Sequence, residues 1–381
     1  MKNILMALFL LSSIVVFAQI PTGYYNSATG TGYTLKTQLH NIIKNHNDQG
    51  YSGLWTTYLT SDRDHQYEND DTVLDVYSEN PTGVDPYNFT YPTNQCGAYS
   101  SEGGCYNREH TVPQSYFGTS VQPMYSDAHF VLPTDGKVNG WRDDHPYGLV
   151  ASTSNPCNAG ATNTPCYTMN GSKLGNNINS GYASGYSQKV FEPVNEFKGD
   201  IARNLLYFVT RYEDQLTGFY SSTTSEAKVM FDGTSDHSYS STFINILLTW
   251  HIQDPVSTRE IERNNAIYVR QNNRNPFIDH PEYVCMIWSS DCAPLNISSS
   301  IRETAFSIYP NPSNNHQINI QSDALSIDKI ELINLNGQLI QSYLKPEMTN
   351  NGYELSDLPS GFYILKLTSN GQTISKKVII N

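Results

Sequence analysis

Three side chains in the first half of the chain have the chemistry to cut a phosphodiester bond with the help of a metal ion. Glu109 and His110 are neighbours in the string NREHTVPQ, and Asn139 follows further along the chain. A carboxylate and an amide oxygen can hold a hard cation, and an imidazole can take a proton from an attacking water. These residue types therefore indicate metal-assisted phosphodiester hydrolysis.

Two strands and a short helix would have to bring these side chains together. Residues 110–112 and the alternating run 127–132 each predict a strand, and helix-start signals at 133–135 place Asn139 in a short helix. Neighbouring side chains on a strand point to opposite faces, so the carboxylate and the imidazole share a site only near a bend or the strand end. On the local pattern alone, a solvated Glu–His pair and a helical Asn without a chemical role are the more frequent alternatives.

Four longer helices are predicted around this unit. Apolar side chains recur at helical spacing in residues 34–46, with Thr34 as the cap, and in residues 200–213 and 243–250. Asp254-Pro255 has the pattern of an N-cap followed by proline at the first helical position, which would open the fourth helix. Irregular stretches are expected between the first two helices. The predicted class is α+β, with a mostly helical catalytic domain.

The N-terminus has the pattern of a secretory signal over residues 1–18. Lys2 precedes an apolar run, and Ala18 stands before the expected cleavage site. No later stretch is long and apolar enough to span a membrane. The mature protein is therefore expected to be exported, with its catalytic region at residues 19–292.

The cysteines agree with an oxidising compartment. They form three pairs that are close in sequence, namely Cys96 with Cys105, Cys157 with Cys166, and Cys285 with Cys292. Six cysteines allow fifteen pairings, so local disulfides are the simplest interpretation rather than a proven one. Each short loop would contribute about 2–3 kcal/mol of stability. Zinc binding is the alternative, but no Cys-x-x-Cys pair is present.

A second domain is predicted at the C-terminus. Residues 293–304 are polar and unpatterned, which indicates a linker, and residues 305–381 contain short alternating runs. Asn336-Gly337 is a strong hairpin signal. A small β-sandwich is the physical interpretation.

This tail resembles the C-terminal sorting domain of type IX secretion substrates. The resemblance rests on the strings YPNP (309–312), NLNGQ (334–338), LPSGFY (358–363) and KKVII (376–380), and it covers the whole tail. It implies recognition by the type IX secretion machinery, with the tail commonly removed at export and the protein secreted or attached to the cell surface. A carbohydrate-binding sandwich is the alternative, although the tail has no clear aromatic platform.

The larger region resembles the endonuclease I family of extracellular or periplasmic nucleases. The strings are NREHTVPQSYFG (107–118), SDAH (126–129), PTDGKVN (133–139), WHIQDPV (250–256) and QNNRNPFIDHP (271–281), and most of residues 24–290 is covered. The resemblance implies a ββα-metal (His-Me finger) site. It makes His110 the general base, and Glu109 and Asn139 the protein ligands of one Mg²⁺ or Mn²⁺. It also implies products with 5′-phosphate ends.

One role has no obvious residue. Nucleases of this kind often place an arginine on the scissile phosphate, and no arginine occurs between His110 and Asn139. Arg142, one helical turn after Asn139, is the first candidate, with Arg203 and Arg274 next. Structural ion pairs with nearby acids are an equally good interpretation of these arginines. The family's aromatic-rich His-x-Trp-Pro string is also replaced here by Thr111-Val112-Pro113.

The charge is unusual for a protein that binds nucleic acid. The chain carries a formal net charge of −13, whereas nucleic-acid binders normally show a basic footprint. The arginines at 259, 263, 270 and 274 could line one basic helix face, or an ion-paired one. Binding is expected to be weak and salt-sensitive without metal, and nothing predicts sequence specificity.

Two functions remain. The favoured one is a secreted, metal-dependent, sequence-nonspecific endonuclease acting on DNA, with RNA as an open second substrate. The alternative is a secreted binding protein of the same fold that has lost catalysis; the presence of Glu109, His110 and Asn139 argues against it. A zinc peptidase is set aside because His-Glu-x-x-His is absent.

Overall fold

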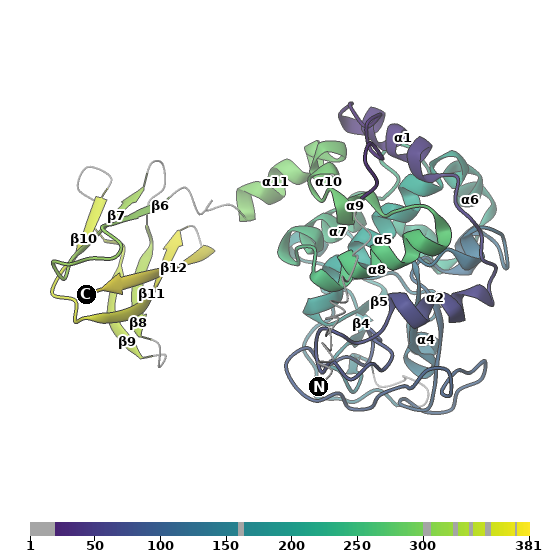
Figure 1. Cartoon of the computed structure of the whole chain (residues 1–381), viewed down its shortest axis with the longest axis horizontal. Helices are drawn as coiled ribbons and strands as arrows, with labels where there is room; N and C mark the ends of the chain where they lie inside the picture. The colour runs from purple at the N-terminus through teal and green to yellow at the C-terminus, as the bar shows by residue number, and fades with distance from the viewer. Residues whose placement is uncertain are drawn as a thin grey trace, which may run out of the picture. The chain divides into compact units, whose positions relative to one another are not determined.

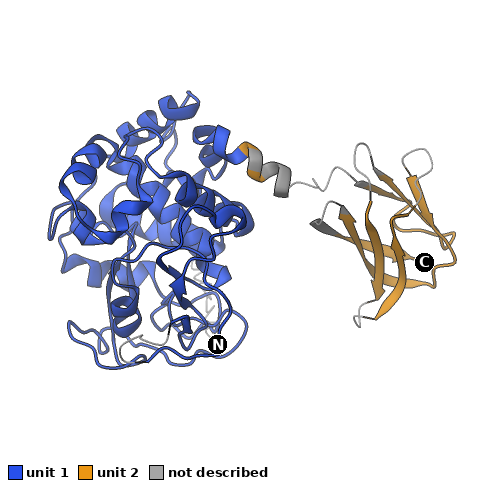
Figure 2. Ribbon diagram, turned by 180° about the vertical axis from the view of Figure 1, so that it is seen from behind, with its two compact units in different colours: residues 1–292 blue, residues 293–381 orange. Residues whose placement is uncertain are grey.

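The chain divides into two compact units, residues 1–292 and 293–381 (Figures 1 and 2). The computed structural model describes residues 20–158, 164–299, 306–322, 327–334, 338–346, 352–369 and 372–381. The predicted signal at residues 1–18 lies outside them. Within these ranges, no helix has the length and apolar character needed to cross a membrane.

More residues of the first unit lie in helices than in strands, as the sequence predicts. They are α1 (Gly32–Ile43), α2 (Gly53–Ser61), α3 (Gln114–Phe117), α4 (Gly136–Arg142), α5 (Lys198–Arg211), α6 (Leu216–Ser222), α7 (Ser241–Gln253), α8 (Thr258–Gln271), α9 (Pro276–Asp279), α10 (Glu282–Ile287) and α11 (Ser289–Ser299). Every residue of α5 is buried, and this helix packs against α1, α7 and α9 (Figure 1). Burial of the apolar surface of α5 from several sides makes it the centre of the core.

Two predicted helix starts are wrong. The first helix begins at Gly32 with Thr31 as its N-cap, rather than with Thr34. The last of the four begins at Thr258, because Ser257 and Glu260 form a reciprocal capping box that satisfies two backbone N–H groups. The carboxylate of Asp254 accepts a hydrogen bond from the Gly199 N–H in the first turn of α5 instead.

The described residues of the first unit form five short strands. They are β1 (Tyr106–His110), β2 (Val131–Asp135), β3 (Cys166–Tyr167), β4 (Lys173–Asn176) and β5 (Lys189–Glu192). β1 pairs antiparallel with β2, and the other three form a sheet in the order β3-β4-β5. The sequence missed this sheet, in a region expected to be irregular, because its strands have only two to four residues.

The second predicted strand is shifted along the chain. Residues 127–130 form a turn, in which the Phe130 and Val131 N–H groups donate to the Asp127 carbonyl. The Asp127 side chain accepts hydrogen bonds from the hydroxyls of Tyr207 and Tyr212. A buried acid with these distant partners holds the turn, so the strand starts only at Val131.

The three predicted disulfides are confirmed. Cys96 pairs with Cys105 just before β1, Cys157 with Cys166 on β3, and Cys285 with Cys292 between α10 and α11. The predicted linker differs in one respect, since α11 continues through residues 293–299.

The second unit is a small β domain, which confirms the predicted class. One sheet has the order β10 (Gly352–Leu355), β7 (Ile318–Ser322), β6 (Phe306–Tyr309), and the other β12 (Gln372–Ile380), β11 (Gly361–Ser369), β8 (Lys329–Asn334), β9 (Leu339–Leu344). Ile320, Leu332 and Leu365 are among the buried side chains of its core. β8 and β9 pair antiparallel; the hairpin turn predicted at Asn336-Gly337 lies outside the described residues.

Candidate active site

The first strand pair and the helix after it form a ββα unit. His110 pairs with Val131 and Glu109 with Leu132, and α4 follows β2 directly. The Asp135 carboxylate accepts hydrogen bonds from the Lys137 and Val138 N–H groups, so it caps the N-terminus of α4. This short connection places α4 against β1.

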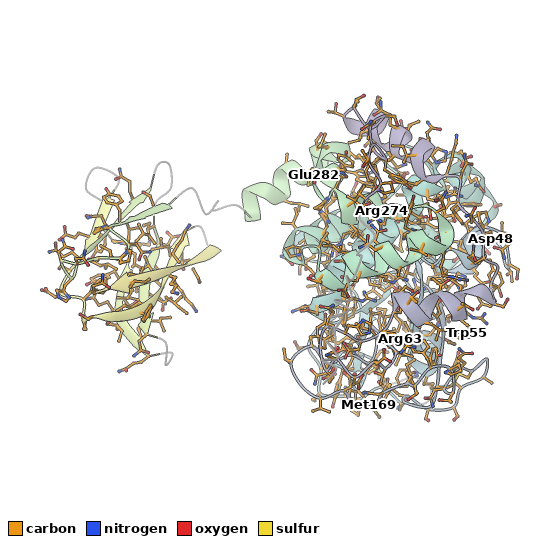
Figure 3. The ribbon with its side chains drawn as sticks, in the orientation of Figure 1. Asp48, Trp55, Arg63, Met169, Arg274 and Glu282 are labelled. Carbon is orange, nitrogen blue, oxygen red and sulfur yellow. A yellow bond between two sulfur atoms is a disulfide. The ribbon has the colours of Figure 1, made fainter. Side chains whose placement is uncertain are left out.

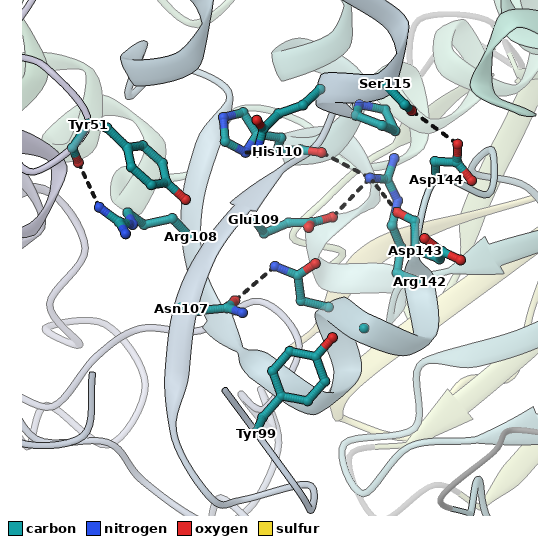
Figure 4. A pocket seen from close by; sticks show the side chains of 14 residues that line it. Tyr51, Tyr99, Asn107, Arg108, Glu109, His110, Ser115, Arg142, Asp143 and Asp144 are labelled. Carbon is teal, nitrogen blue, oxygen red and sulfur yellow. Dashed lines mark hydrogen bonds and ion pairs between the residues drawn. The ribbon is translucent and has the colours of Figure 1, made fainter. Parts of the chain in front are cut away.

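One open pocket of about 640 Å³ lies on this unit (Figure 4). It is lined by Tyr51, Tyr99, Asn107, Arg108, Glu109, His110, Pro113, Gln114, Ser115, Asn139, Gly140, Arg142, Asp143 and Asp144. All four predicted site residues are therefore in one place. Glu109 and His110 border the same pocket although they are adjacent on β1, because His110 is the last residue of that strand.

Glu109 is held at one oxygen. Its Oε1 accepts hydrogen bonds from the hydroxyls of Tyr77 at 3.0 Å and Tyr147 at 3.5 Å, and lies 3.2 Å from Nη1 of Arg142. No residue that the structure describes donates a hydrogen bond to Oε2. Burial raises the pKa of Glu109 to about 7, against the opposing effects of Arg142 and Tyr77.

The geometry around His110 decides which of its nitrogens can act as a base. Nε2 lies 3.1 Å from the carbonyl oxygen of Tyr125. A carbonyl can only accept, so Nε2 carries the proton and Nδ1 keeps its lone pair. The ring also stacks on Tyr125, with ring centroids 5.6 Å apart. Burial lowers the pKa of His110 to about 3, so the imidazole is neutral at physiological pH.

Arg142 lies in the pocket wall with most of its guanidinium engaged. Nη1 donates to the His110 carbonyl at 2.9 Å and Nη2 to the Thr111 carbonyl at 2.7 Å, in addition to the contact with Glu109. Its Nε is buried and has no hydrogen-bond partner. Arg142 therefore ties α4 to the end of β1 and holds the carboxylate between them.

A second arginine, which is not among the candidates predicted from the sequence, lines the pocket. The guanidinium of Arg108 lies 3.4 Å from the ring centroid of Tyr51 and 4.3 Å from that of Trp55. Its Nη1 donates to the Tyr51 carbonyl at 2.9 Å (Figure 4). Tyr51 in turn stacks on Tyr125, with centroids 3.9 Å apart. Arg108 stands in the recognised NREH string, but only the fold brings Tyr51 and Tyr125 beside it.

The other candidate arginines are structural. Arg203 pairs with Glu260 at 2.5 Å, and Arg274, which is labelled in Figure 3, pairs with Asp279 at 2.6 Å. Neither lines the pocket. Arg259 and Arg263 are also buried and ion-paired, with Asp200 and Asp62 as partners. The helix that carries them is therefore not a solvent-facing basic surface.

The oxygen atoms at the pocket suit a divalent metal ion. The Nδ2–H of Asn139 donates to Oδ1 of Asn107 at 2.8 Å, and no described residue bonds to the side-chain Oδ1 of Asn139. Among the described residues, that oxygen and Oε2 of Glu109 are the oxygens of the two predicted ligands that accept no hydrogen bond. A carboxylate and an amide oxygen form the kind of donor set that hard cations accept.

A ββα unit that presents a carboxylate, a carboxamide and a neutral imidazole to one open pocket defines a metal-assisted phosphodiester nuclease. Comparison with known families agrees. The profile of Endonuclease I matches residues 31–282, and that of the Secretion system C-terminal sorting domain matches residues 307–381. The chain belongs to the Endonuclease I family, which generally uses a divalent metal.

Two relatives support the same assignment. The chain is 33% identical over 276 residues to an extracellular ribonuclease of Bacillus subtilis (strain 168), which covers 70% of this chain and 78% of that protein. It is 32% identical, with the same coverage, to an extracellular ribonuclease of Bacillus amyloliquefaciens. With its sorting domain for type IX secretion, the protein is a nuclease that is secreted or held at the cell surface.

Proposed function

We propose that this nuclease hydrolyses both DNA and RNA without sequence preference, with one Mg²⁺ or Mn²⁺ ion, and leaves 5′-phosphate ends. The observation that carries the proposal is the orientation of His110. Its Nε2 is committed to the Tyr125 carbonyl, so the lone pair lies on Nδ1, where the side-chain amide of Gln114 donates to it at 3.4 Å; the attacking water would take the place of that amide. The neutral ring needs no prior deprotonation.

Each residue of the pocket has its own role in the proposed reaction. His110 takes a proton from the attacking water at Nδ1. Glu109 and Asn139 would hold the cation, which when bound stabilises negative charge on the scissile phosphate and the leaving 3′ oxygen. Arg142 keeps Glu109 in place through the contact at 3.2 Å and contributes positive charge to the pocket wall. Arg108 adds a second guanidinium at the same pocket.

The substrate class follows from this chemistry and from the relatives. An attack by water does not use the 2′-hydroxyl of the sugar, so the same residues can act on DNA and on RNA. The two Bacillus relatives are named ribonucleases, which supports the RNA activity. The sequence contains no recognisable base-reading module, so we expect no sequence preference.

The mature protein should be tested on supercoiled plasmid and on a single-stranded RNA oligonucleotide, with Mg²⁺, with Mn²⁺ and with a chelator. We expect cleavage of both substrates that stops with the chelator. The His110→Ala variant should lose about 10²–10⁴-fold in rate, the usual contribution of a general base. His280→Ala, which removes a histidine that does not line the pocket, is the matched control.

The chemical groups at the ends of the products show whether water or the 2′-hydroxyl is the nucleophile. Mass spectrometry should find 5′-phosphate and 3′-hydroxyl ends on both substrates. A 2′,3′-cyclic phosphate on RNA would show that the 2′-hydroxyl is the nucleophile and would contradict the role of His110. A folded protein that cuts neither substrate with any divalent cation would favour the non-catalytic binding alternative.

A further inference from the structure

A second group of acidic side chains lies outside the active pocket, in the segment between α2 and β1. Asp64, Glu68 and Glu79 each offer a carboxylate oxygen, and these oxygens lie within 4.8 Å of one another. The basic residues of this segment, Arg63 and His65, pair with Asp71 instead (Arg63 is labelled in Figure 3). Among the described residues, none of the three carboxylates has a basic partner.

Glu79 distinguishes this group from a cluster of surface acids, because its side chain is buried. It is only 1% exposed, and its Oε1 is buried without a hydrogen-bond partner. Oε2 of Glu68 is also buried and unpartnered. An unpartnered buried carboxylate costs several kcal/mol, on the order of the penalties for burying polar groups, unless something else satisfies it. No described residue supplies a hydrogen bond to Oε1 of Glu79.

The charges around Glu79 have the same sign. Burial, followed by the carboxylates of Asp85, Glu68 and Asp64, raises the pKa of Glu79 to about 9. Burial and the charges of Glu68 and Asp64 also raise the pKa of Asp85 to about 6, although a backbone hydrogen bond from Asn80 opposes them. A cation among these groups would remove the repulsion.

We propose that Asp64, Glu68 and Glu79 form a second cation site, structural rather than catalytic, that takes calcium. All three donors are carboxylates, and calcium accepts six to eight oxygens in flexible geometry, whereas magnesium tends to keep several of its waters. The N–H groups of Gln66, Tyr67 and Asn69 donate to the Asp64 carboxylate and fix its orientation. An exported protein also meets calcium at the concentrations that extracellular sites bind.

The site has a direct connection to the active pocket through the chain. Tyr77, which donates to Oε1 of Glu109, is two residues from Glu79. Asp75, at the start of the same turn, accepts from the Tyr77 N–H at 2.8 Å and from the Asp135 N–H at 2.7 Å. A cation bound at Glu79 would therefore hold the turn that positions Tyr77.

The test separates this site from the active one by using a background variant. Glu109→Gln with Asn139→Ala, in the mature protein, removes both proposed ligands of the active pocket. Equilibrium dialysis with calcium alone should still find one bound calcium per chain, and the thermal midpoint should rise with added calcium. Adding Glu79→Gln should abolish both effects, while the control Asp214→Asn, at an exposed acid, should leave both unchanged.

Three results would overturn the proposal. The first is a folded background variant that binds no calcium, since Glu79 would then simply be a protonated acid. The second is retention of the bound calcium after Glu79→Gln. The third is magnesium binding at this site as tightly as calcium. If Glu79→Gln does not fold, Glu68→Gln replaces it, and a calcium affinity unchanged by Glu68→Gln would count against the site.

Discussion

The carboxylate of Glu109 is held from one side only. Tyr77, Tyr147 and Arg142 all reach Oε1, and no described residue bonds to Oε2. Groups that orient a ligand in this way set its direction and basicity, and their loss typically costs about 10–100-fold in metal affinity. The two tyrosine hydroxyls also bond to each other at 2.8 Å. This network fixes the orientation of Glu109, the metal ligand that we propose.

Removing one hydroxyl at a time tests this arrangement. Tyr77→Phe should weaken the affinity of the active site for Mg²⁺ by about 10-fold, because it removes a donor to a metal ligand. Tyr147→Phe should have a smaller effect, because its hydroxyl lies 3.5 Å from Oε1 rather than 3.0 Å. The measurement is the cleavage rate as a function of Mg²⁺ concentration. Equal losses would mean that the two hydroxyls contribute alike despite their distances, and no change in either variant would mean that Arg142 alone positions Glu109.

Two residues in the turn between α7 and α8 could cap a helix, and each bonds to a different one. Ser257 caps α8, so Asp254 is free to bond to the Gly199 N–H of α5. Burial, followed by the nearby charge of Asp200, raises the pKa of Asp254 to about 7. The folded protein therefore holds a proton on Asp254 over a range of pH in which the unfolded chain has lost it.

This proton predicts a dependence of stability on pH. A group with a raised pKa contributes stability below its unfolded pKa and loses that contribution as pH rises through the folded value. Asp254→Asn keeps an acceptor for Gly199 but cannot ionise. Relative to this variant, wild type should therefore lose stability between about pH 4 and about pH 7, by less than the 1.4 kcal/mol per pH unit of a full proton. Urea unfolding at several pH values measures it, and a constant difference would show that Asp254 is ionised throughout.

At the scale of the whole molecule, all residues of the active pocket belong to one of the two units. The residues that line it lie between Tyr51 and Asp144, and the second unit begins at Ala293. The β domain has a buried core of its own. Catalysis and sorting are therefore assigned to separate parts of the chain.

Truncation should separate the two roles. A variant that ends at Ser299 keeps α11 and the Cys285–Cys292 disulfide and lacks the β domain. We expect an unchanged cleavage rate from the purified variant and a failure of export in the native cell. Calorimetry should lose one unfolding transition while the other keeps its midpoint. A large fall in cleavage rate would mean that the β domain supports the nuclease unit.

The sequence by itself determined the chemistry and the compartment of this protein. Glu109, His110, Asn139, the paired cysteines and the C-terminal strings are local signals, because their meaning depends on residue type and short spacing. The positions of the longer helices followed from apolar periodicity for the same reason. The predicted helix starts were wrong where two residues close in sequence could each serve as the N-cap.

The tertiary structure decided how the active site works. Tyr77, Tyr147 and Tyr125 come from separate segments, and no local pattern marks them as partners of Glu109 and His110. No local pattern predicts the ion-pair partners of the buried Arg203 and Arg274 either. Such contacts depend on which surfaces pack together, and packing joins residues that are far apart in the chain. Which nitrogen of His110 keeps its lone pair, and which oxygen of Glu109 accepts no hydrogen bond from a described residue, are therefore properties of the fold.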